Sequence, residues 1–269
     1  MKHLLKEGWE DLRQKFKKSR VFLFLDYDGT LTPIVRNPDL AVLSPSRRKQ
    51  LEKTARTKKI RIALVSGRSL STLKKLAGVR GLLYVGNHGL EREENGSRRV
   101  HPAAQKSRKL LQRIKPRLEA AFRKLPGIFV EDKNLTLTVH YRRASSATAR
   151  RAKKVFWNTL GAELKRRRIR ITEGKKVWEV RPFFAWNKGN VVLWFLKRAA
   201  RGSRSVLPVY IGDDATDEDA FRSLGRKGVT VKVGGKTKAS CAAYYVKATG
   251  EVFQFLKRLS LLKGRVEND

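Results

Sequence analysis

The chain has 269 residues, enough to bury a sizeable core as one large domain or as a main domain with a smaller insert. Hydrophobic residues make up 41%, which excludes a disordered chain, and the one cysteine, Cys241, excludes an intrachain disulfide. Sixty-two lysines and arginines against 24 aspartates and glutamates give a net charge of +38, which attracts polyanions.

The apolar runs of the chain are short. The longest, Val21–Leu25 and Val191–Leu196, fall far below the roughly 20 residues of a membrane helix. The N-terminal residues hold no continuous apolar stretch as long as that of a signal peptide. We therefore expect a cytoplasmic protein without membrane contact. We also expect a monomer, because so strong a net charge opposes self-association.

The first third of the chain alternates buried strands with helices. The continuous apolar run at 21–25 predicts a strand that is covered on both faces, and the segments 60–65 and 82–85 predict a second buried strand and a third strand. Ser44 and Pro45 suit an N-cap and a first helical position, which predicts a helix to about residue 58. Another helix is expected to start near residue 69. This alternation predicts an α/β fold with a parallel sheet and helices on both faces.

The pattern changes near residue 102. A long basic helix is expected there, followed by two strands, a second helix and two more strands, at 102–124, 128–130, 135–141, 145–165, 168–171 and 177–180. This helix-strand-strand block, repeated once, predicts a small α+β insert. The densest charge block of the chain, residues 165–170, lies inside this insert.

The first pattern returns after Pro182. The expected elements alternate between helix and strand, at 187–201, 206–211, 215–224, 229–233 and 249–262. Because this segment resumes the earlier alternation, we predict that it continues the α/β sheet on the other side of the α+β insert.

Six of the ten aspartates lie in two clusters, and the first cluster follows the first predicted strand. Asp26 and Asp28 belong to an Asp-x-Asp-Gly-Thr sequence in which Gly29 allows a sharp turn. Ligands bind beyond the carboxyl ends of parallel strands, and alternate residues of an extended chain point the same way. One carboxylate can attack phosphorus while its neighbour, with a raised pKa, carries a proton. The alternative is an acidic turn that caps the next element.

The second cluster also ends a predicted strand, and it begins a helix. Five acids fall within the seven residues 213–219, more than a helix N-terminus needs. Hard carboxylate oxygens at a strand end suit Mg²⁺. We therefore expect the carboxyl groups of Asp26 and Asp213 to lie close enough to share one magnesium ion.

Two shorter segments and two histidines complete the set of candidates. Ser66 and Gly67 lie between a strand and a helix, where a hydroxyl and backbone N–H groups can hold a phosphoryl oxygen, although Ser-Gly is also an ordinary turn. Lys188 begins a helix and can neutralise both the nucleophile and the phosphoryl group. His88 and His101 are alternative acid–base residues, but His88, in a tight glycine-flanked loop, is expected to orient the backbone or to cap the sheet edge.

Six segments, in this order, resemble those of the trehalose-phosphate phosphatases within the haloacid dehalogenase-like (HAD) superfamily. They are residues 25–34, 65–68, 86–91, 179–182, 187–189 and 212–219, and the resemblance spans about residues 20–255. It implies a Rossmann-like HAD core, residues 1–103 and 183–269. It also implies a mobile α+β cap domain, residues 104–182, inserted between the second and third motifs.

The resemblance also implies roles for individual residues. Asp26 would be the nucleophile and Asp28 the general acid and later base, and the phosphoryl group would be held by Ser66, Gly67 and Lys188. Mg²⁺ would lie between Asp26, the backbone carbonyl of Asp28 and Asp213, with Asp214 and Asp217 as supporting residues. The sugar would be bound by Glu131, Lys133, Arg142, Glu179, Arg68 and Asn87, unless the charges among them are ordinary exposed strand charges.

The activity implied is the Mg²⁺-dependent hydrolysis of trehalose 6-phosphate through an aspartyl-phosphate on Asp26. Three alternatives remain open: a related phosphatase of sucrose phosphate, glucosylglycerol phosphate or mannosyl-phosphoglycerate, a basic nucleic-acid-binding protein, and an inactive regulatory relative. The sequence contains no recognition-helix, zinc or aromatic RNA-binding motif, so we expect at most non-specific polyanion binding. No catalytic reason for a charge of +38 is evident.

Overall fold

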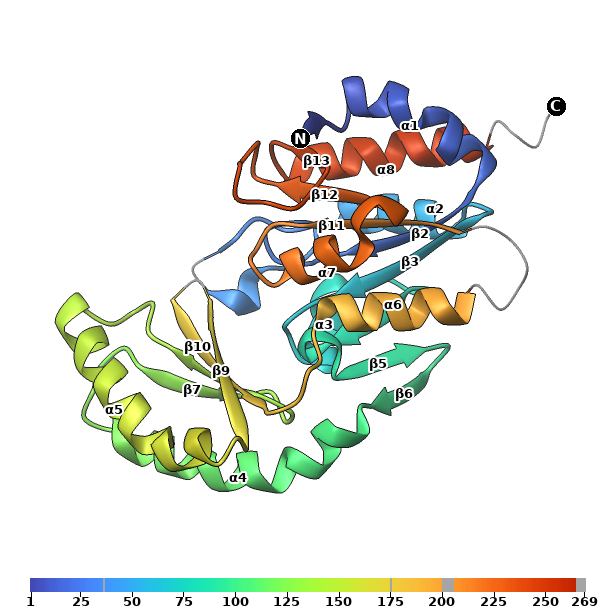
Figure 1. Ribbon diagram of the computed structural model, residues 1–269. Coiled ribbons are helices and arrows are strands. Elements are labelled where there is room, and N and C mark those ends of the chain that lie inside the picture. Colours follow the sequence, from blue (N-terminus) through green and yellow to red (C-terminus); the bar gives the residue numbers. More distant parts are fainter. Residues whose placement is uncertain (36, 175, 200–205, 265–269) are drawn as a thin grey trace. The chain divides into compact units, whose positions relative to one another are not determined.

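The structure, a computed structural model, describes residues 1–35, 37–174, 176–199 and 206–264. The chain divides into two compact units (Figure 1). Unit 1 consists of residues 1–99 and 186–269, and unit 2 is the continuous segment 100–185. Among the described residues, no helix is both long enough and apolar enough to cross a bilayer.

Unit 1 is built on a nine-stranded sheet in the order β1-β13-β12-β11-β2-β3-β4-β5-β6. The strands are β1 (Lys2–His3), β2 (Arg20–Leu25), β3 (Ile60–Val65), β4 (Leu83–Gly86), β5 (Glu91–Glu94), β6 (Ser97–Val100), β11 (Val206–Gly212), β12 (Val229–Val233) and β13 (Tyr244–Val246). The pairs from β1 to β4 are parallel, and β5 is antiparallel to β4. The predicted α/β class with a mainly parallel sheet is therefore confirmed.

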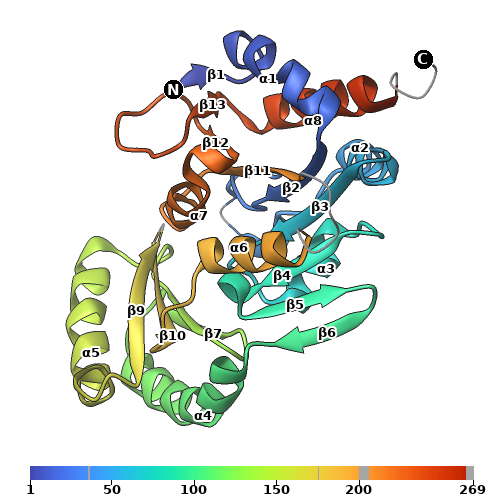
Figure 2. The ribbon, with the colours of Figure 1, turned by 45° about the vertical axis from the view of Figure 1, so that its right-hand side comes forward.

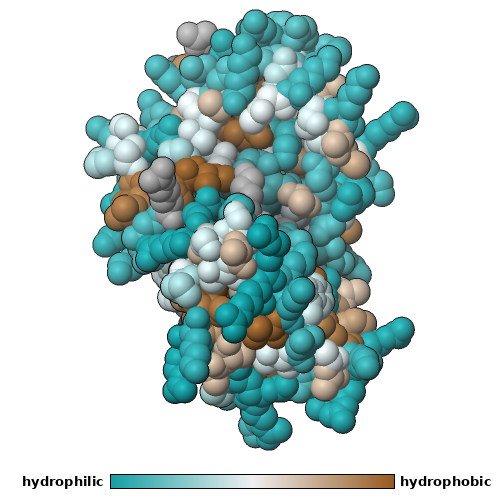
Figure 3. All heavy atoms as spheres, turned by 90° about the vertical axis from the view of Figure 1, so that its left-hand side faces the viewer, coloured by the Kyte–Doolittle hydropathy of each residue, from teal (hydrophilic) through white to brown (hydrophobic). Residues whose placement is uncertain are grey.

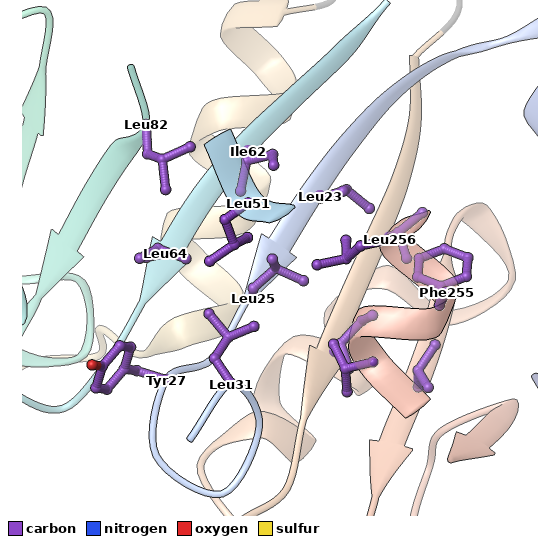
Figure 4. Packing of buried hydrophobic residues seen from close by; sticks show 14 of the residues in the cluster. Leu23, Leu25, Tyr27, Leu31, Leu51, Ile62, Leu64, Leu82, Phe255 and Leu256 are labelled. Atoms are coloured by element: carbon purple, nitrogen blue, oxygen red, sulfur yellow. The ribbon is translucent and has the colours of Figure 1, made fainter. Parts of the chain in front are cut away.

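Helices cover both faces of this sheet because its central strands are apolar on both faces. Along β2, Leu23 and Leu25 point into one core and Phe22 and Phe24 into the other. The first core is completed by the helices α1 (Glu7–Lys18), α2 (Pro45–Arg56), α3 (Leu70–Ala77) and α8 (Thr249–Gly264), and the second by α6 (Lys188–Ala199) and α7 (Asp217–Leu224). Figure 4 shows Leu23 and Leu25 between the neighbouring strand and α8. Burying each such side chain contributes about 1.5–3 kcal/mol.

Unit 2 is a four-stranded antiparallel sheet with two helices on one face. Its elements are α4 (Pro102–Phe122), β7 (Phe129–Asp132), β8 (Leu137–His140), α5 (Ser146–Lys165), β9 (Ile169–Gly174) and β10 (Val177–Pro182), with the strand order β7-β8-β10-β9. Figure 2 shows α4 and α5 along the same side of this sheet. Val139, Trp178 and Val180 pack against the helices, so the residues that alternate with them lie on the opposite face.

Several elements differ from the sequence prediction. The strand β1, the helix α1, the strand β13 and the β5–β6 hairpin were not predicted. The helix expected over residues 187–201 is described as Lys188–Ala199, and residues 200 and 201 lie outside the described residues.

The surface is consistent with the charged composition, since mostly hydrophilic side chains (teal) cover the face seen in Figure 3.

Candidate active site

The first acid cluster lies at the carboxyl end of the central strand β2. Asp26 is 4% exposed, and its backbone N–H donates to the carbonyl of Ile211 on β11 at 2.9 Å. The chain then turns at Gly29, where φ is +82°. A Cβ atom at this position would lie 2.2 Å from Oδ2 of Asp213. Only glycine fits there, because the Asp213 carboxyl lies directly against the turn that follows β2.

Lys188, at the start of α6, joins the two acid clusters. Its Nζ donates to Oδ1 of Asp26 and to Oδ1 of Asp217, each at 2.7 Å, and its side chain is 2% exposed. Burial raises the pKa of Asp26 well above its ordinary value, although the Lys188 ammonium opposes this. Burial alone would lower the pKa of Lys188, but the carboxylates of Asp217 and Asp26 outweigh it and raise this pKa. The ammonium therefore stays charged beside the acids.

Asp217 organises the loop between β11 and α7. Its Oδ1 also accepts from the hydroxyl of Tyr210 at 2.8 Å. Its Oδ2 accepts from the backbone N–H groups of Asp213 at 2.9 Å and Asp214 at 3.0 Å. Burial raises the pKa of Asp217 to about 7, against the opposing charge of Lys188. Because all four acceptor positions of this carboxylate are used, Asp217 suits a supporting role.

Asp214 supports the same loop from within. Its Oδ1 accepts from the backbone N–H and the hydroxyl of Thr216, both at 2.8 Å, and from the backbone N–H of Asp217 at 3.2 Å. Burial alone would raise the pKa of Asp214, but Lys188 and these hydrogen bonds outweigh it and lower this pKa. Asp214 is therefore an ionised carboxylate that fixes the start of α7.

The acids that meet here suit a hard divalent cation. One carboxylate oxygen from each of Asp26, Asp213 and Asp217 lies within 4.8 Å of the other two. The bonds of Asp217 are already used, so Asp26 and Asp213 are the carboxylates best placed to hold a cation. A donor set made only of oxygens fits Mg²⁺ better than a soft transition metal.

Asp28 is held by Arg68, which was predicted to contact the sugar. The guanidinium donates from Nε to Oδ2 and from Nη2 to Oδ1 of Asp28, both at 2.7 Å, and also to the carbonyl of Pro38 at 2.9 Å. The Asp28 side chain is 37% exposed. In this arrangement Arg68 is a bidentate partner of the predicted general acid.

Ser66 and Gly67 follow β3 in a loop that passes close to His88. The Oγ of Ser66 accepts from the backbone N–H of Arg68 at 3.1 Å. A Cβ atom at Gly67 would lie 2.5 Å from the ring of His88, so a side chain does not fit there. The backbone N–H of His88 donates to the carbonyl of Ser66 at 2.9 Å, which joins the two loops.

A second loop, Asn87–Gly89, is hydrogen-bonded to the Ser66 loop through its backbone. Asn87, His88 and Gly89 all have positive φ, a conformation that is strained for the first two. The Asn87 backbone N–H donates to the carbonyl of Arg68 at 2.7 Å, and its Nδ2 donates to Oε1 of buried Glu91 at 2.6 Å. Asn87 was expected to bind the sugar, and here its amide donates to Glu91 inside the protein.

The predicted sugar residues of unit 2 lie on the face of the sheet that the helices leave uncovered. Glu131 on β7 and Glu179 on β10 both pair in register with Thr138 on β8. Lys133 Nζ donates to Oε1 of Glu179 at 3.3 Å. Arg142 follows β8 and is exposed. Three of the four residues therefore share one sheet face, and Arg142 lies at its edge.

Sequence reasoning assigned no role to three residues that the structure connects to these sites. They are Tyr210, which donates to Asp217, Glu91, which accepts from Asn87, and His140, whose Nε2 lies 2.7 Å from Oε2 of Glu131. A tyrosine in an apolar strand just before Gly-Asp-Asp was the one available signal, because a buried hydroxyl needs a partner.

Comparisons with known proteins agree on one family. The family model of trehalose-phosphatases matches residues 24–249. Trehalose-phosphate phosphatase B of Arabidopsis thaliana is 32% identical over 263 residues, which are 93% of this chain and 69% of that protein.

Two solved structures share the fold of this chain. The C-terminal domain of the C. albicans trehalose-6-phosphate phosphatase has a TM-score of 0.81 at 28% identity, covering 94% of this chain and 97% of that one. A haloacid dehalogenase-like hydrolase from Bacteroides thetaiotaomicron shares the fold at a TM-score of 0.61 and 15% identity, covering 90% and 100%.

Proposed function

The chain belongs to the trehalose-phosphatase family, and from this premise we propose that it hydrolyses trehalose 6-phosphate to trehalose and phosphate. We propose a Mg²⁺-dependent reaction through an aspartyl-phosphate on Asp26. The observation that carries the proposal is buried Asp26, bonded to Lys188 at 2.7 Å and close to the carboxylate of Asp213.

In the first step, an oxygen of Asp26 attacks phosphorus and the bond from phosphorus to the sugar oxygen breaks. Asp28, two residues further along the same turn, gives its proton to the departing sugar oxygen. Lys188 provides a fixed positive charge beside the attacked group and needs no rearrangement during the reaction. The product of this step is trehalose, and the phosphoryl group remains on Asp26.

In the second step, Asp28 takes a proton from water, whose oxygen attacks the phosphorus of the aspartyl-phosphate. The bond from phosphorus to Asp26 breaks, which releases phosphate and restores the carboxylate. Asp28 thus returns to its protonated state, so the two steps together consume one water and leave the protein unchanged.

Asp28 cannot donate a proton while both of its oxygens accept from Arg68. A carboxylate in a bidentate ion pair is ionised and has no proton to give. The proposal therefore requires the Arg68–Asp28 bond to open, or to shift to one oxygen, before the sugar leaves. The exposed position of Asp28 allows this movement, whereas Asp26 is fixed.

The remaining core residues would hold the phosphoryl group and the cation. Because Ser66 Oγ accepts from the backbone of Arg68, its own proton can be donated to a phosphoryl oxygen beside Gly67. Asp26, Asp213 and the backbone carbonyl of Asp28 would hold Mg²⁺. When bound, this ion neutralises the negative charge that develops on the phosphoryl oxygens.

We further propose that unit 2 is the cap that selects the sugar. Glu131, Glu179 and Lys133 on the sheet face opposite its helices, with Arg142 just after β8, would bond the disaccharide hydroxyls, since charged groups make strong directional hydrogen bonds. Glu179 is buried and already bonded to Lys133 and Thr136, so its position is fixed before the substrate binds. A cytoplasmic location and a monomeric state stay predictions from the sequence.

One assay tests the proposed function. Purified protein is supplied with trehalose 6-phosphate, sucrose phosphate, glucosylglycerol phosphate and mannosyl-phosphoglycerate, with Mg²⁺ or with a chelator, and released phosphate is measured. We expect the trehalose ester to be hydrolysed fastest and the chelator to stop the reaction. Asp26→Asn, which keeps the size of the side chain, should abolish turnover. Preference for another ester would transfer the proposal to that sugar, and near-normal turnover in the variant would remove the covalent mechanism.

A further inference from the structure

Phe129 is a large apolar side chain on the polar face of the unit 2 sheet. It starts β7 and is 44% exposed, whereas its neighbour Val130 packs against the core between the sheet and the helices. Strand residues alternate between faces, so Phe129 lies on the same face as Glu131, two positions later. The Phe129 side chain is not part of the hydrophobic core of unit 2, so its place on this face needs an explanation other than core packing.

The ring of Phe129 is fixed in a flat stack. It pairs in register with His140 on β8, and the two rings lie 4.3 Å apart with an interplanar angle of 3°. Nε2 of His140 lies 2.7 Å from Oε2 of Glu131. The imidazole is therefore stacked against the phenyl ring by one face and bonded to the carboxylate by its Nε2 edge. The outcome is a rigid apolar surface directly beside a hydrogen-bonding group.

A row of polar residues continues from this stack across the sheet. Glu131, Thr138, Glu179 and Thr172 are paired in register on β7, β8, β10 and β9, so they face the same way. At this end of the sheet face, the flat aromatic surface lies beside the carboxylate of Glu131, which is 39% exposed, whereas Thr138 and Glu179 are buried. These two features suit a pyranose ring, whose C–H bonds line its two faces and whose hydroxyls project from its rim.

We propose that Phe129, stacked on His140, is a platform for one pyranose ring of the substrate, while Glu131 accepts from hydroxyls of that ring. This inference rests on the proposed function, and it adds a specificity determinant: phosphate esters of glycosides are favoured over esters with no sugar ring. His140 is a positioning residue, because it acts by fixing both the phenyl ring and the carboxylate.

A purely structural role for Phe129 is the competing explanation. Cross-strand aromatic pairs stabilise antiparallel sheets, and Phe129 pairs with His140 across β7 and β8. The test must therefore separate ligand binding from folding. Trp157 on α5 provides a matched control, because it is another exposed aromatic of unit 2, 37% exposed, and lies on the helix side of the sheet.

The experiment compares Phe129→Leu, Phe129→Trp and Trp157→Leu. For each, kcat/KM is measured with trehalose 6-phosphate and with p-nitrophenyl phosphate, which has no sugar. We expect Phe129→Leu to lower the ratio of the two values about tenfold, through KM for the sugar ester, since leucine is apolar but not flat. Phe129→Trp should keep most of the ratio, and Trp157→Leu should leave it unchanged.

A binding measurement on the Asp26→Asn background makes the result independent of turnover. Titration calorimetry with trehalose 6-phosphate should show about tenfold weaker binding when Phe129→Leu is added, and unchanged binding when Trp157→Leu is added. Equal affinity with and without Phe129→Leu overturns the platform, as does an equal loss for both esters in the kinetics. Failure of the wild-type protein to release phosphate from any sugar ester refutes the proposed function instead.

Discussion

Replacing Asp217 with asparagine keeps the size of the side chain and removes two of its acceptor positions. In the structure, one oxygen of Asp217 accepts from Lys188 and Tyr210, and the other accepts from two backbone N–H groups. In either orientation, the amide NH₂ of asparagine faces two donors. The variant therefore loses two hydrogen bonds in a fully buried place, and it places donor against donor.

The size of this loss can be worked from the bonds involved. A hydrogen bond with a charged partner contributes about 1.5–3 kcal/mol, and breaking a buried ion pair costs about 3–5 kcal/mol. We expect Asp217→Asn to lower the free energy of unfolding by about 3–5 kcal/mol, a large part of the roughly 5–15 kcal/mol of a typical domain. At about 2–4 °C for each kcal/mol, the melting temperature should fall by about 6–20 °C.

Differential scanning calorimetry with Mg²⁺ chelated measures this change without a contribution from bound metal. Tyr210→Phe is the matched control, because it removes one hydrogen bond to the same carboxylate and should cause about half of the loss. A melting temperature for Asp217→Asn at or above that of Tyr210→Phe would refute the view that all four acceptor positions of Asp217 are used.

Three further predictions concern the turn after β2, the general acid and the β3–β4 region. Gly29→Ala should lower the free energy of unfolding by at least about 2 kcal/mol and abolish phosphate release, because alanine disfavours positive φ and its Cβ meets Asp213. Urea unfolding and a phosphate-release assay measure the two effects. An unchanged urea midpoint together with normal activity would contradict this prediction. Arg68→Lys should raise kcat about threefold, because a lysine ammonium contacts one oxygen of Asp28 and leaves the other free to carry the proton; an unchanged or lower kcat would contradict the required opening of this bond. Burial raises the pKa of Tyr84, so the stability that its protonated hydroxyl contributes is present below about pH 10 and is lost as the pH rises through the raised pKa. Tyr84→Phe should therefore show a smaller fall of the urea midpoint at alkaline pH than the wild-type protein. An equal fall in both proteins would exclude this contribution of Tyr84.

The parts of the fold that the sequence predicted are those in which burial is visible along the chain. The run Val21–Leu25 is apolar at every position because both faces of β2 are covered, and that pattern needs no partner to be recognised. The strands β1 and β13 have two and three residues, too few to form a pattern, and they form by pairing across the sheet, β1 with β13 and β13 with β12.

The β5–β6 hairpin was missed although a local signal was present. Its strands are almost entirely polar, so no apolar alternation marks them. Its turn, however, is Asn95-Gly96, and both residues have positive φ, as the commonest two-residue hairpin turn requires. Turn chemistry would have predicted this hairpin where hydrophobic pattern could not.

In the candidate site, the meeting of the two acid clusters was predictable and the pairing of side chains was not. Asp26 and Asp213 end parallel strands that are adjacent in the sheet, so one topological rule brings them together. The bond between Arg68 and Asp28 joins two loops, and the bond between Glu131 and His140 depends on strand register. Such contacts are set by geometry that residue types alone do not encode.

The discontinuity of unit 1 has a consequence for the order in which the chain folds during synthesis. Unit 2 is one continuous segment, so it can fold as soon as it emerges from the ribosome. The strand β2 pairs with β11, which is made more than 180 residues later. Until then, one edge of the apolar strand Val-Phe-Leu-Phe-Leu stays unpaired, and an unpaired apolar edge can pair with another chain.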